Sequence, residues 1–263
     1  MANQVKPLKK FGQNFLINEK YAEKIVNTLQ CQTDDIIIEI GPGKGVLTQH
    51  LIKQKNNKII AIEIDPRLSE LLKTKFGTKI RIIQESVLDV SFKKFDSNKS
   101  IRIIGNIPYY LTSQILFKIF ETGINISQAV LMIQREVADR LLAEPRTKAY
   151  SYLTIMAQYH NNVQRVLEVN RDNFYPIPNV DSTVVSIEPK NHTSDLQDYQ
   201  LFRQIVITAF QQRRKMLRNS LKKLLKEKNI ETIKSISLTL RPEELFIQQY
   251  INLSNEISTY RKN

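Results

Sequence analysis

The sequence predicts an α/β protein: a mostly parallel seven-stranded sheet with an antiparallel hairpin at one edge, followed by a small all-helical C-terminal domain. Three observations lead to this fold class. Short apolar runs rich in isoleucine alternate with helical stretches over residues 35–140. A link containing two prolines, residues 170–182, joins the next two apolar runs. Beyond about residue 191, apolar residues recur only at helical spacing, so we expect no further strands there.

Five short apolar runs are expected to form the parallel strands. They are apolar on both faces and are separated by helical stretches, which is typical of a parallel sheet covered by helices on both sides. A helix after the first strand is expected to reach about Lys55. Pro66 is expected at the first position of the next helix, where a missing N–H is tolerated. The five predicted strands are residues 36–40, 58–64, 80–84, 101–104 and 129–133.

The two remaining strands, residues 163–169 and 183–187, are expected to pair with each other. Parallel neighbours need a long crossover, usually a helix. Pro176 and Pro178 prevent such a helix in the link between these two strands. We therefore expect an antiparallel pair at the edge of the sheet.

The C-terminal part of the chain is expected to form a separate helical domain. Apolar residues recur at helical spacing in residues 201–210, 215–225 and 242–253, and residues 211–228 are expected to form one basic helix. We predict two domains: residues 1–191 would bind a small molecule, and residues 192–263 would form the helical domain.

Composition points to a polyanionic partner. The chain has 263 residues, and its 39 lysines and arginines against 26 acids give a net charge of +13. Nucleic acid is the partner that we favour, and an anionic membrane surface is the lesser alternative. One cysteine excludes an internal disulfide framework, and three scattered histidines give no metal site. No apolar run approaches 18 residues and no signal peptide is recognisable, so we expect a cytoplasmic protein, by default a monomer.

A glycine turn after the first strand predicts a nucleoside pocket. Glu39, Gly41, Gly43 and Gly45 follow the spacing E-x-G-x-G-x-G, whereas the third glycine of a nicotinamide fingerprint is absent. Glu63 and Asp65 end the second strand, where an acid suits a ribose with two free hydroxyls, and Asp89 follows the third strand and suits an adenine amino group. The carboxyl ends of adjacent parallel strands meet at one edge, so these groups are expected to form one adenosine pocket. A phosphate-binding loop is missing, which argues against ATP.

The segment Asn106–Ile107–Pro108–Tyr109 joins the fourth strand to a helix that we expect near Thr112. It looks like the motif of enzymes that methylate exocyclic amino nitrogens. The lone pair of an adenine N6 is delocalised into the ring, so it is a poor nucleophile. The Asn106 side-chain oxygen and the Pro108 carbonyl are expected to accept its two N–H bonds, which would direct the lone pair at the methyl group. Tyr109 offers a face for an unstacked base. The alternative is an ordinary strand-to-helix turn with a buried tyrosine.

Taken together, these motifs resemble the KsgA/RsmA small-subunit ribosomal RNA adenine dimethyltransferases. The resemblance runs through "KKFGQNFL", "EIGPGKGVLT", "IEID", "GNIPYYLTS", "MIQREVADRL", "TKAYSYL", "FYPIPNVDSTVV", "QRRKMLRNSL" and "RPEEL". It implies a class I, Rossmann-like methyltransferase fold and S-adenosylmethionine as cofactor. It also implies dimethylation of the N6 amino groups of two adjacent adenines near the 3′ end of 16S rRNA, in an assembling small ribosomal subunit.

The same resemblance implies roles for individual residues. Asn14, Leu16, Gly41, Glu63 and Asp89 would bind the cofactor, and Asn106 would contact both the cofactor and the target.

For the target base, the resemblance implies that Phe174 packs against it opposite Tyr109. Without the resemblance, Phe174 would be interpreted as a core residue and the N-terminal segment as a disordered arm. Asn179 stands where relatives commonly carry lysine, which puts a phosphate contact there in doubt.

A basic run in the C-terminal domain is expected to face RNA, although a solvated helix face is the simpler explanation. Its candidate RNA-binding residues are Arg213, Arg214, Lys215, Arg218 and Lys222. Two rival functions stay open at this point. One is the macrolide-resistance methylation of 23S rRNA, and the other is a non-catalytic nucleic-acid-binding relative.

Overall fold

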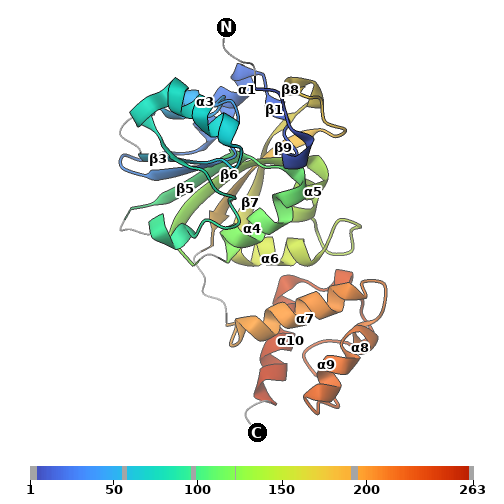
Figure 1. Cartoon of the computed structure of the whole chain (residues 1–263). Helices are drawn as coiled ribbons and strands as arrows, with labels where there is room; N and C mark the ends of the chain where they lie inside the picture. The colour runs from blue at the N-terminus through green and yellow to red at the C-terminus, as the bar shows by residue number, and fades with distance from the viewer. Residues whose placement is uncertain (1–4, 55–57, 96–98, 122, 191–194, 261–263) are drawn as a thin grey trace. The chain divides into compact units, whose positions relative to one another are not determined.

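One sheet organises the computed structural model, which describes residues 5–54, 58–95, 99–121, 123–190 and 195–260. Within these residues seven strands pair in the order β4-β3-β2-β5-β6-β9-β7. Strands β3, β5, β6, β7 and β9 of this sheet are labelled in Figure 1. Neighbours from β4 to β6 are parallel, and β9 runs antiparallel to both β6 and β7. The predicted fold class is confirmed, including the antiparallel pair at the edge.

All seven predicted strands are present, with ends shifted by a few residues. Every side chain of the interior strand β2 is buried. Its Ile38 pairs with Ile60 on one side and Ile103 on the other, so apolar side chains repeat across the sheet in register. Burying each such side chain stabilises the fold by about 1.5–3 kcal/mol. The strands are β2 (Ile36–Ile40), β3 (Lys58–Ile62), β4 (Arg81–Ile83), β5 (Ile101–Asn106), β6 (Ile126–Gln134), β7 (Asn161–Val169) and β9 (Ser182–Pro189).

A second, two-stranded sheet was not predicted. β1 (Phe15–Leu16) pairs antiparallel with β8 (Phe174–Tyr175), and this pairing ties the N-terminal segment to the link before β9. Leu16 and Phe174 face each other across the pair and are both buried in the main apolar cluster. The simpler interpretation of the N-terminal segment as a disordered arm is therefore wrong for residues 15–16.

Five helices accompany the first part of the sheet within the described residues. Pro66 begins α3 as predicted, and the Asp65 side chain caps that helix by accepting from the Arg67 N–H at 3.0 Å. The helix expected to reach Lys55 is wrong in length: α2 ends at Leu51, and Lys55 lies outside the described residues. The helices are α1 (Glu19–Thr28), α2 (Thr48–Leu51), α3 (Pro66–Phe76), α4 (Thr112–Phe120) and α5 (Arg135–Leu141).

The chain divides into two compact units. The first contains Met1–Ala138 and Asn161–Pro189, and the second contains Asp139–His160 and Lys190–Asn263. The predicted boundary falls at residues 191–194, which lie outside the described residues. The second unit includes a segment that the predicted domains assigned to the first.

Aromatic packing explains this assignment. α6 (Tyr152–His160) lies against α7 (Tyr199–Gln211), with the Tyr159 and Phe202 ring centroids 4.9 Å apart. The Nε2 atom of His160 and the hydroxyl of Tyr199 lie 2.8 Å apart and share a hydrogen bond. α6 therefore belongs with the C-terminal helices, which end with α10 (Ile247–Thr259).

The single basic helix predicted over residues 211–228 is wrong. α7 ends at Gln211, and the chain continues as two short helices, α8 (Leu217–Ser220) and α9 (Lys222–Glu227). The cause is tertiary: the N–H groups of Leu217 and Arg218 donate to the carbonyls of Leu240 and Leu238, at 2.8 and 2.9 Å. These bonds replace the i−4 bonds that a continuous helix would make.

A buried polar network spans the amino end of the first unit's sheet. Arg102 on β5 pairs with Asp35 at 2.5 Å, and both side chains are at least nine-tenths buried. The guanidinium also donates to Gln128 Oε1 at 3.0 Å, and Gln128 Nε2 donates to Ser186 Oγ at 3.0 Å. The network therefore links β5, β6 and β9. No helix in the described part of the chain has the length and apolar character needed to cross a membrane.

Candidate active site

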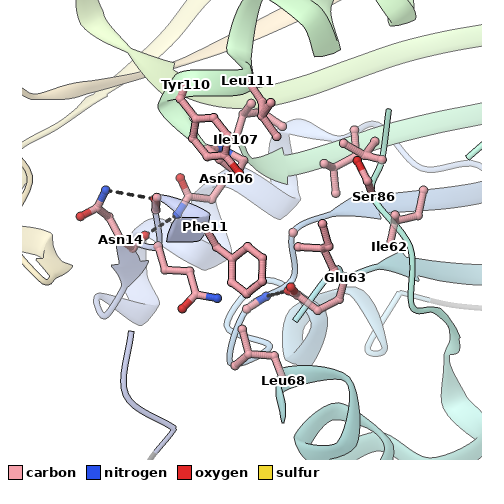
Figure 2. Close-up of a pocket in the computed structure, with 18 of the residues that line it drawn as sticks. Phe11, Asn14, Ile62, Glu63, Leu68, Ser86, Asn106, Ile107, Tyr110 and Leu111 are labelled. Atoms are coloured by element: carbon pink, nitrogen blue, oxygen red, sulfur yellow. Dashed lines mark hydrogen bonds between the residues drawn. The ribbon is translucent and has the colours of Figure 1, made fainter. Parts of the chain in front are cut away.

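A cavity opens in the first unit where β2, β3 and β5 end (Figure 2). The N-terminal segment contributes residues 11–15, and the glycine turn contributes Ile40, Gly41 and Gly43. The remaining walls come from residues 62–64, Leu68, residues 85–87 and residues 106–111. The position agrees with the rule that α/β sheets bind ligands beyond the carboxyl ends of their strands.

The glycine turn is shaped by close packing and by a carboxylate. Gly41, Gly43 and Gly45 have positive φ angles of 62°, 59° and 79°, which L side chains rarely adopt. A Cβ at Gly45 would also lie 2.4 Å from the Phe76 ring. Glu63 completes the turn, because its Oε2 accepts from the Gly43 N–H at 3.2 Å. Gly41 and Gly43 line the cavity, so the backbone of the turn borders the space for a ligand.

Glu63 lies at the cavity with its carboxylate held in place. Oε1 accepts from the Asp65 N–H at 2.9 Å, and the residue is 5% exposed. Burial raises the pKa of Glu63, and the hydrogen bonds from Asp65 and Gly43 oppose that shift. Each carboxylate oxygen keeps a further lone pair, so the group can accept from a ligand hydroxyl.

The N-terminal segment is tied across the cavity at two points. Asn106 donates its Nδ2–H to the Asn14 carbonyl at 2.8 Å (Figure 2). Gln13 donates its Nε2–H to Asp65 Oδ2 at 3.0 Å. Asn14 lines the cavity as predicted for a cofactor contact, whereas Leu16 is buried in the apolar cluster behind it. Nothing in the sequence pattern indicated the role of Gln13.

The Asn106–Tyr109 segment is docked on β6. The Ile107 N–H donates to the Met132 carbonyl at 3.0 Å. The Pro108 carbonyl accepts from the Leu111 N–H at 3.0 Å. The single Thr112 hydroxyl hydrogen lies between the Tyr109 carbonyl at 3.1 Å and the Pro108 carbonyl at 3.3 Å. The Pro108 carbonyl therefore keeps a lone pair, and its role as an acceptor for a substrate amine stays a prediction.

Tyr109 and Tyr110 line the cavity differently. The Tyr109 hydroxyl lies 2.8 Å from the Ser182 hydroxyl, and burial raises the pKa of Tyr109, so the phenol is neutral. Tyr110 is 59% exposed at the cavity mouth. Ser182 stands 73 residues from Tyr109 in the chain, and no sequence signal joined the two.

Two predicted site residues lie elsewhere than expected. Asp89 is exposed and does not line the cavity, whereas Glu85 and Ser86 from the same loop do. Phe174 is 1% exposed and packs in the apolar cluster, which matches its interpretation as a core residue more closely than an open base platform. The neighbouring Tyr175 is 58% exposed.

The predicted RNA-binding residues belong to the second unit. Arg214, Lys215, Arg218 and Lys222 are exposed. Arg213 differs, because its guanidinium donates to the Lys148 and Thr147 carbonyls at 2.7 and 2.9 Å. Its Nε also lies 2.5 Å from Glu243 Oε2, an ion pair without hydrogen-bond geometry. Arg213 therefore stabilises its own unit and is less available to a phosphate than its neighbours.

Glu39 is buried beneath the glycine turn and is expected to make stability depend on pH. Its Oε2 accepts from the Thr48 hydroxyl at 2.7 Å, and desolvation raises its pKa to about 7. An acid whose folded pKa is raised binds its proton more tightly in the folded state. The contribution of Glu39 to the free energy of unfolding is therefore fully present below about pH 4.5. It is lost as pH rises toward 7, and the loss amounts to up to about 3 kcal/mol.

Glu39→Gln should remove this loss while keeping an acceptor for Thr48. Urea unfolding at several pH values should show parent stability falling relative to the variant between about pH 4.5 and 7. Glu23→Gln, on the exposed face of α1, is the control and should follow the parent. Parallel stability curves for parent and Glu39→Gln would contradict the buried, protonated state of Glu39.

Comparisons with known proteins give one consistent family. Residues 5–259 match the family model described as "Ribosomal RNA adenine dimethylase". A protein of Francisella tularensis subsp. novicida named ribosomal RNA small subunit methyltransferase A is 37% identical over 98% of this chain and 100% of the relative. A protein of the same name from Mycoplasma capricolum is 40% identical over 96% of this chain and 98% of the relative.

Two solved structures are similar over nearly the whole chain. A dimethyladenosine transferase from Plasmodium falciparum has a TM-score of 0.77 and 26% identity, covering 94% of this chain and 98% of that one. The 23S rRNA methyltransferase ErmE has a TM-score of 0.66 and 24% identity, covering 93% and 100%. The second likeness is one of fold alone.

Proposed function

Because the chain belongs to the ribosomal RNA adenine dimethylase family, we propose that it dimethylates the N6 amino groups of two adjacent adenines near the 3′ end of 16S rRNA. The methyl donor would be S-adenosylmethionine, and the substrate would be the assembling small ribosomal subunit. The relatives named above, which are small-subunit methyltransferases, support the 16S target over 23S rRNA. We further propose that the protein is a cytoplasmic monomer. We also propose that it needs no metal ion, because a sulfonium methyl group is already activated.

The orientation of the Asn106 amide is the observation that supports this chemistry most directly. The Asn14 carbonyl can only accept, so Nδ2 of Asn106 must point toward it and Oδ1 is left as the acceptor beside the cavity. An acceptor held in advance can take one N–H of an adenine N6. The lone pair of N6 is then directed away from this N–H bond and toward the methyl group as the nitrogen becomes tetrahedral.

The cofactor would lie along the glycine turn. We propose that Glu63 accepts from the ribose hydroxyls and that the backbones of Gly41 and Asn14 form adjoining walls. Ser86 lines the cavity where Asp89 was expected, so we assign the adenine end of the cofactor to Ser86. Leu16 would support this wall from the apolar cluster without direct contact.

The target base would enter beside Tyr109. We propose that the Tyr109 ring is the stacking face for an adenine rotated out of the RNA. A base contact from Phe174 stays a prediction, because its ring is 1% exposed in the structure. Asn179 would contribute no charge to the RNA contact.

Primer extension on both ribosomal RNAs tests the proposed function. Small and large subunits lacking the modifications would be incubated with protein and S-adenosylmethionine, and N6-dimethyladenine would block the reverse transcriptase. We expect adjacent stops near the 3′ end of 16S rRNA and none on 23S rRNA, and no stops without cofactor. Stops on 23S rRNA alone would favour the macrolide-resistance function, and none on either would favour a non-catalytic binder.

The exposed basic residues of the second unit are expected to contact RNA phosphates. Arg214→Ala with Lys215→Ala should flatten the slope of log affinity for the subunit against log salt by about 1–2, because a protein that neutralises fewer phosphates releases fewer counterions when it binds. Cofactor affinity should not change.

Lys20→Ala with Lys24→Ala removes the same charge from the exposed face of α1 and serves as the matched control. Equal slopes for the parent and the Arg214/Lys215 variant would mean that these charges are a solvated surface.

A further inference from the structure

Ser182 is a fully buried residue whose hydroxyl lies beside that of Tyr109, the proposed base-stacking residue. It is the first residue of β9, is 0% exposed, and lies opposite Gln134 on β6 and Val169 on β7. Its Oγ lies 2.8 Å from the Tyr109 hydroxyl. We propose that Ser182 is a positioning residue that holds the Tyr109 ring in the plane needed to receive the target base. This inference rests on the proposed function.

The two partners differ in how firmly the backbone holds them. Ser182 pairs with residues on both neighbouring strands, so its backbone is held on both sides. Tyr109 begins a short 3-10 turn, Tyr109–Leu111, that has no side-chain cap. A tyrosine in such a turn can rotate about two side-chain torsions, and a hydrogen bond from its far end to a rigid strand limits both. The sheet, through Ser182, thereby orients the Tyr109 ring, whereas the turn that carries Tyr109 does not.

The same bond fixes the ring relative to the acceptor of the reaction. Asn106 and Tyr109 lie three residues apart, and Ile107 between them is bonded to Met132 on β6. β6 is also the strand beside Ser182. The β6–β9 pair therefore holds both groups in position: the segment that carries Asn106 Oδ1 through β6, and the Tyr109 ring through Ser182. A base stacked on the ring would present its amine to Asn106 at a defined angle, and loss of that angle slows transfer.

A purely structural role would be to satisfy the buried Ser182 hydroxyl and the part-buried Tyr109 hydroxyl. That role predicts a loss of stability in Ser182→Ala with a normal rate for the folded protein. The positioning role predicts a lower rate of methyl transfer at saturation, with cofactor affinity unchanged. Tyr109→Phe separates the two further, because it keeps the ring and removes only the bond to Ser182.

Single-turnover methyl transfer to the small subunit tests the proposal, with cofactor and subunit saturating. Ser182→Ala and Tyr109→Phe should each lower the rate roughly 3- to 10-fold, the effect of removing one hydrogen bond. The double variant should be no slower than either single variant, because both remove the same interaction. Calorimetry should give the parent affinity for S-adenosylmethionine in all three.

Ser186→Ala is the matched control. It removes a buried hydroxyl from the same strand, one bonded to Gln128 and remote from the cavity lining, and should leave the rate at the parent value. A folded Ser182→Ala variant with the parent rate overturns the proposal, and so does a double variant whose rate reduction is the product of the two single reductions. If Ser182→Ala does not fold, Tyr109→Phe decides alone, and the parent rate in that variant overturns the proposal. An inactive parent protein would instead contradict the proposed function itself.

Discussion

Replacing Asn106 by alanine is expected to lower the rate of methyl transfer by about 10²–10³-fold, the usual cost of losing one preorganised polar partner of a transition state. The variant loses Oδ1 at the cavity and the Nδ2 bond to the Asn14 carbonyl, which holds the N-terminal segment. Single-turnover transfer to the small subunit, with saturating cofactor, measures the chemical step. Thermal melts run beside it report whether the variant is folded.

Asn106→Asp refines the same test. It keeps an acceptor at the same reach, but its carboxylate cannot donate to the Asn14 carbonyl and would face that oxygen with a negative charge. We therefore expect a rate between those of the alanine variant and the parent. Asn255→Ala is the matched control, because Asn255 Nδ2 also donates to a backbone carbonyl at 2.8 Å, that of Asp195 in the second unit. A fully folded Asn106→Ala protein with the parent rate would remove Asn106 from the mechanism.

Arg102→Ala is expected to destabilise the first unit by about 3–5 kcal/mol, because it leaves the buried Asp35 carboxylate without its counter-charge. Gln128 Oε1 loses a donor in the same step. Urea unfolding at neutral pH, monitored by circular dichroism, gives the change in the free energy of unfolding. The network lies at the amino end of the sheet, so cofactor affinity of the folded variant should stay near that of the parent.

Arg165→Ala provides the comparison for an exposed pair. Arg165 and Glu168 form an ion pair on β7 with side chains 35% and 44% exposed, and its removal should cost at most about 1 kcal/mol. Replacing both partners of the buried pair, as Arg102→Met with Asp35→Leu, should recover much of the lost stability, because no unpaired charge then remains. Equal destabilisation by Arg102→Ala and Arg165→Ala would contradict the effect attributed to burial of the first pair.

The sheet and the position of the cavity follow from short-range features of the sequence. Runs such as Ile36–Ile40 are apolar on both faces, and only a strand covered on both sides buries them. The glycines after this run allow the positive φ angles that the turn requires, and Glu63 directly follows the neighbouring strand β3. Strand direction then brings these residues and Asn106 to one edge of the sheet. Each of these features depends on residues close together in the chain.

The site beyond that edge depends on contacts between distant residues, and these only the tertiary structure decides. Strand order places Ser182 beside Tyr109, and the pairing of β1 with β8 buries Phe174. The loop after β4 presents Ser86 to the cavity in place of Asp89.

The basic run shows the same limit in the second unit. Its apolar spacing predicts one helix, but the Leu217 and Arg218 N–H groups bond to the carbonyls of Leu240 and Leu238, far along the chain, and the helix is divided. Periodicity and composition report which face of an element is apolar. They do not report which distant donor or acceptor will satisfy a given polar group, because that depends on how the elements pack.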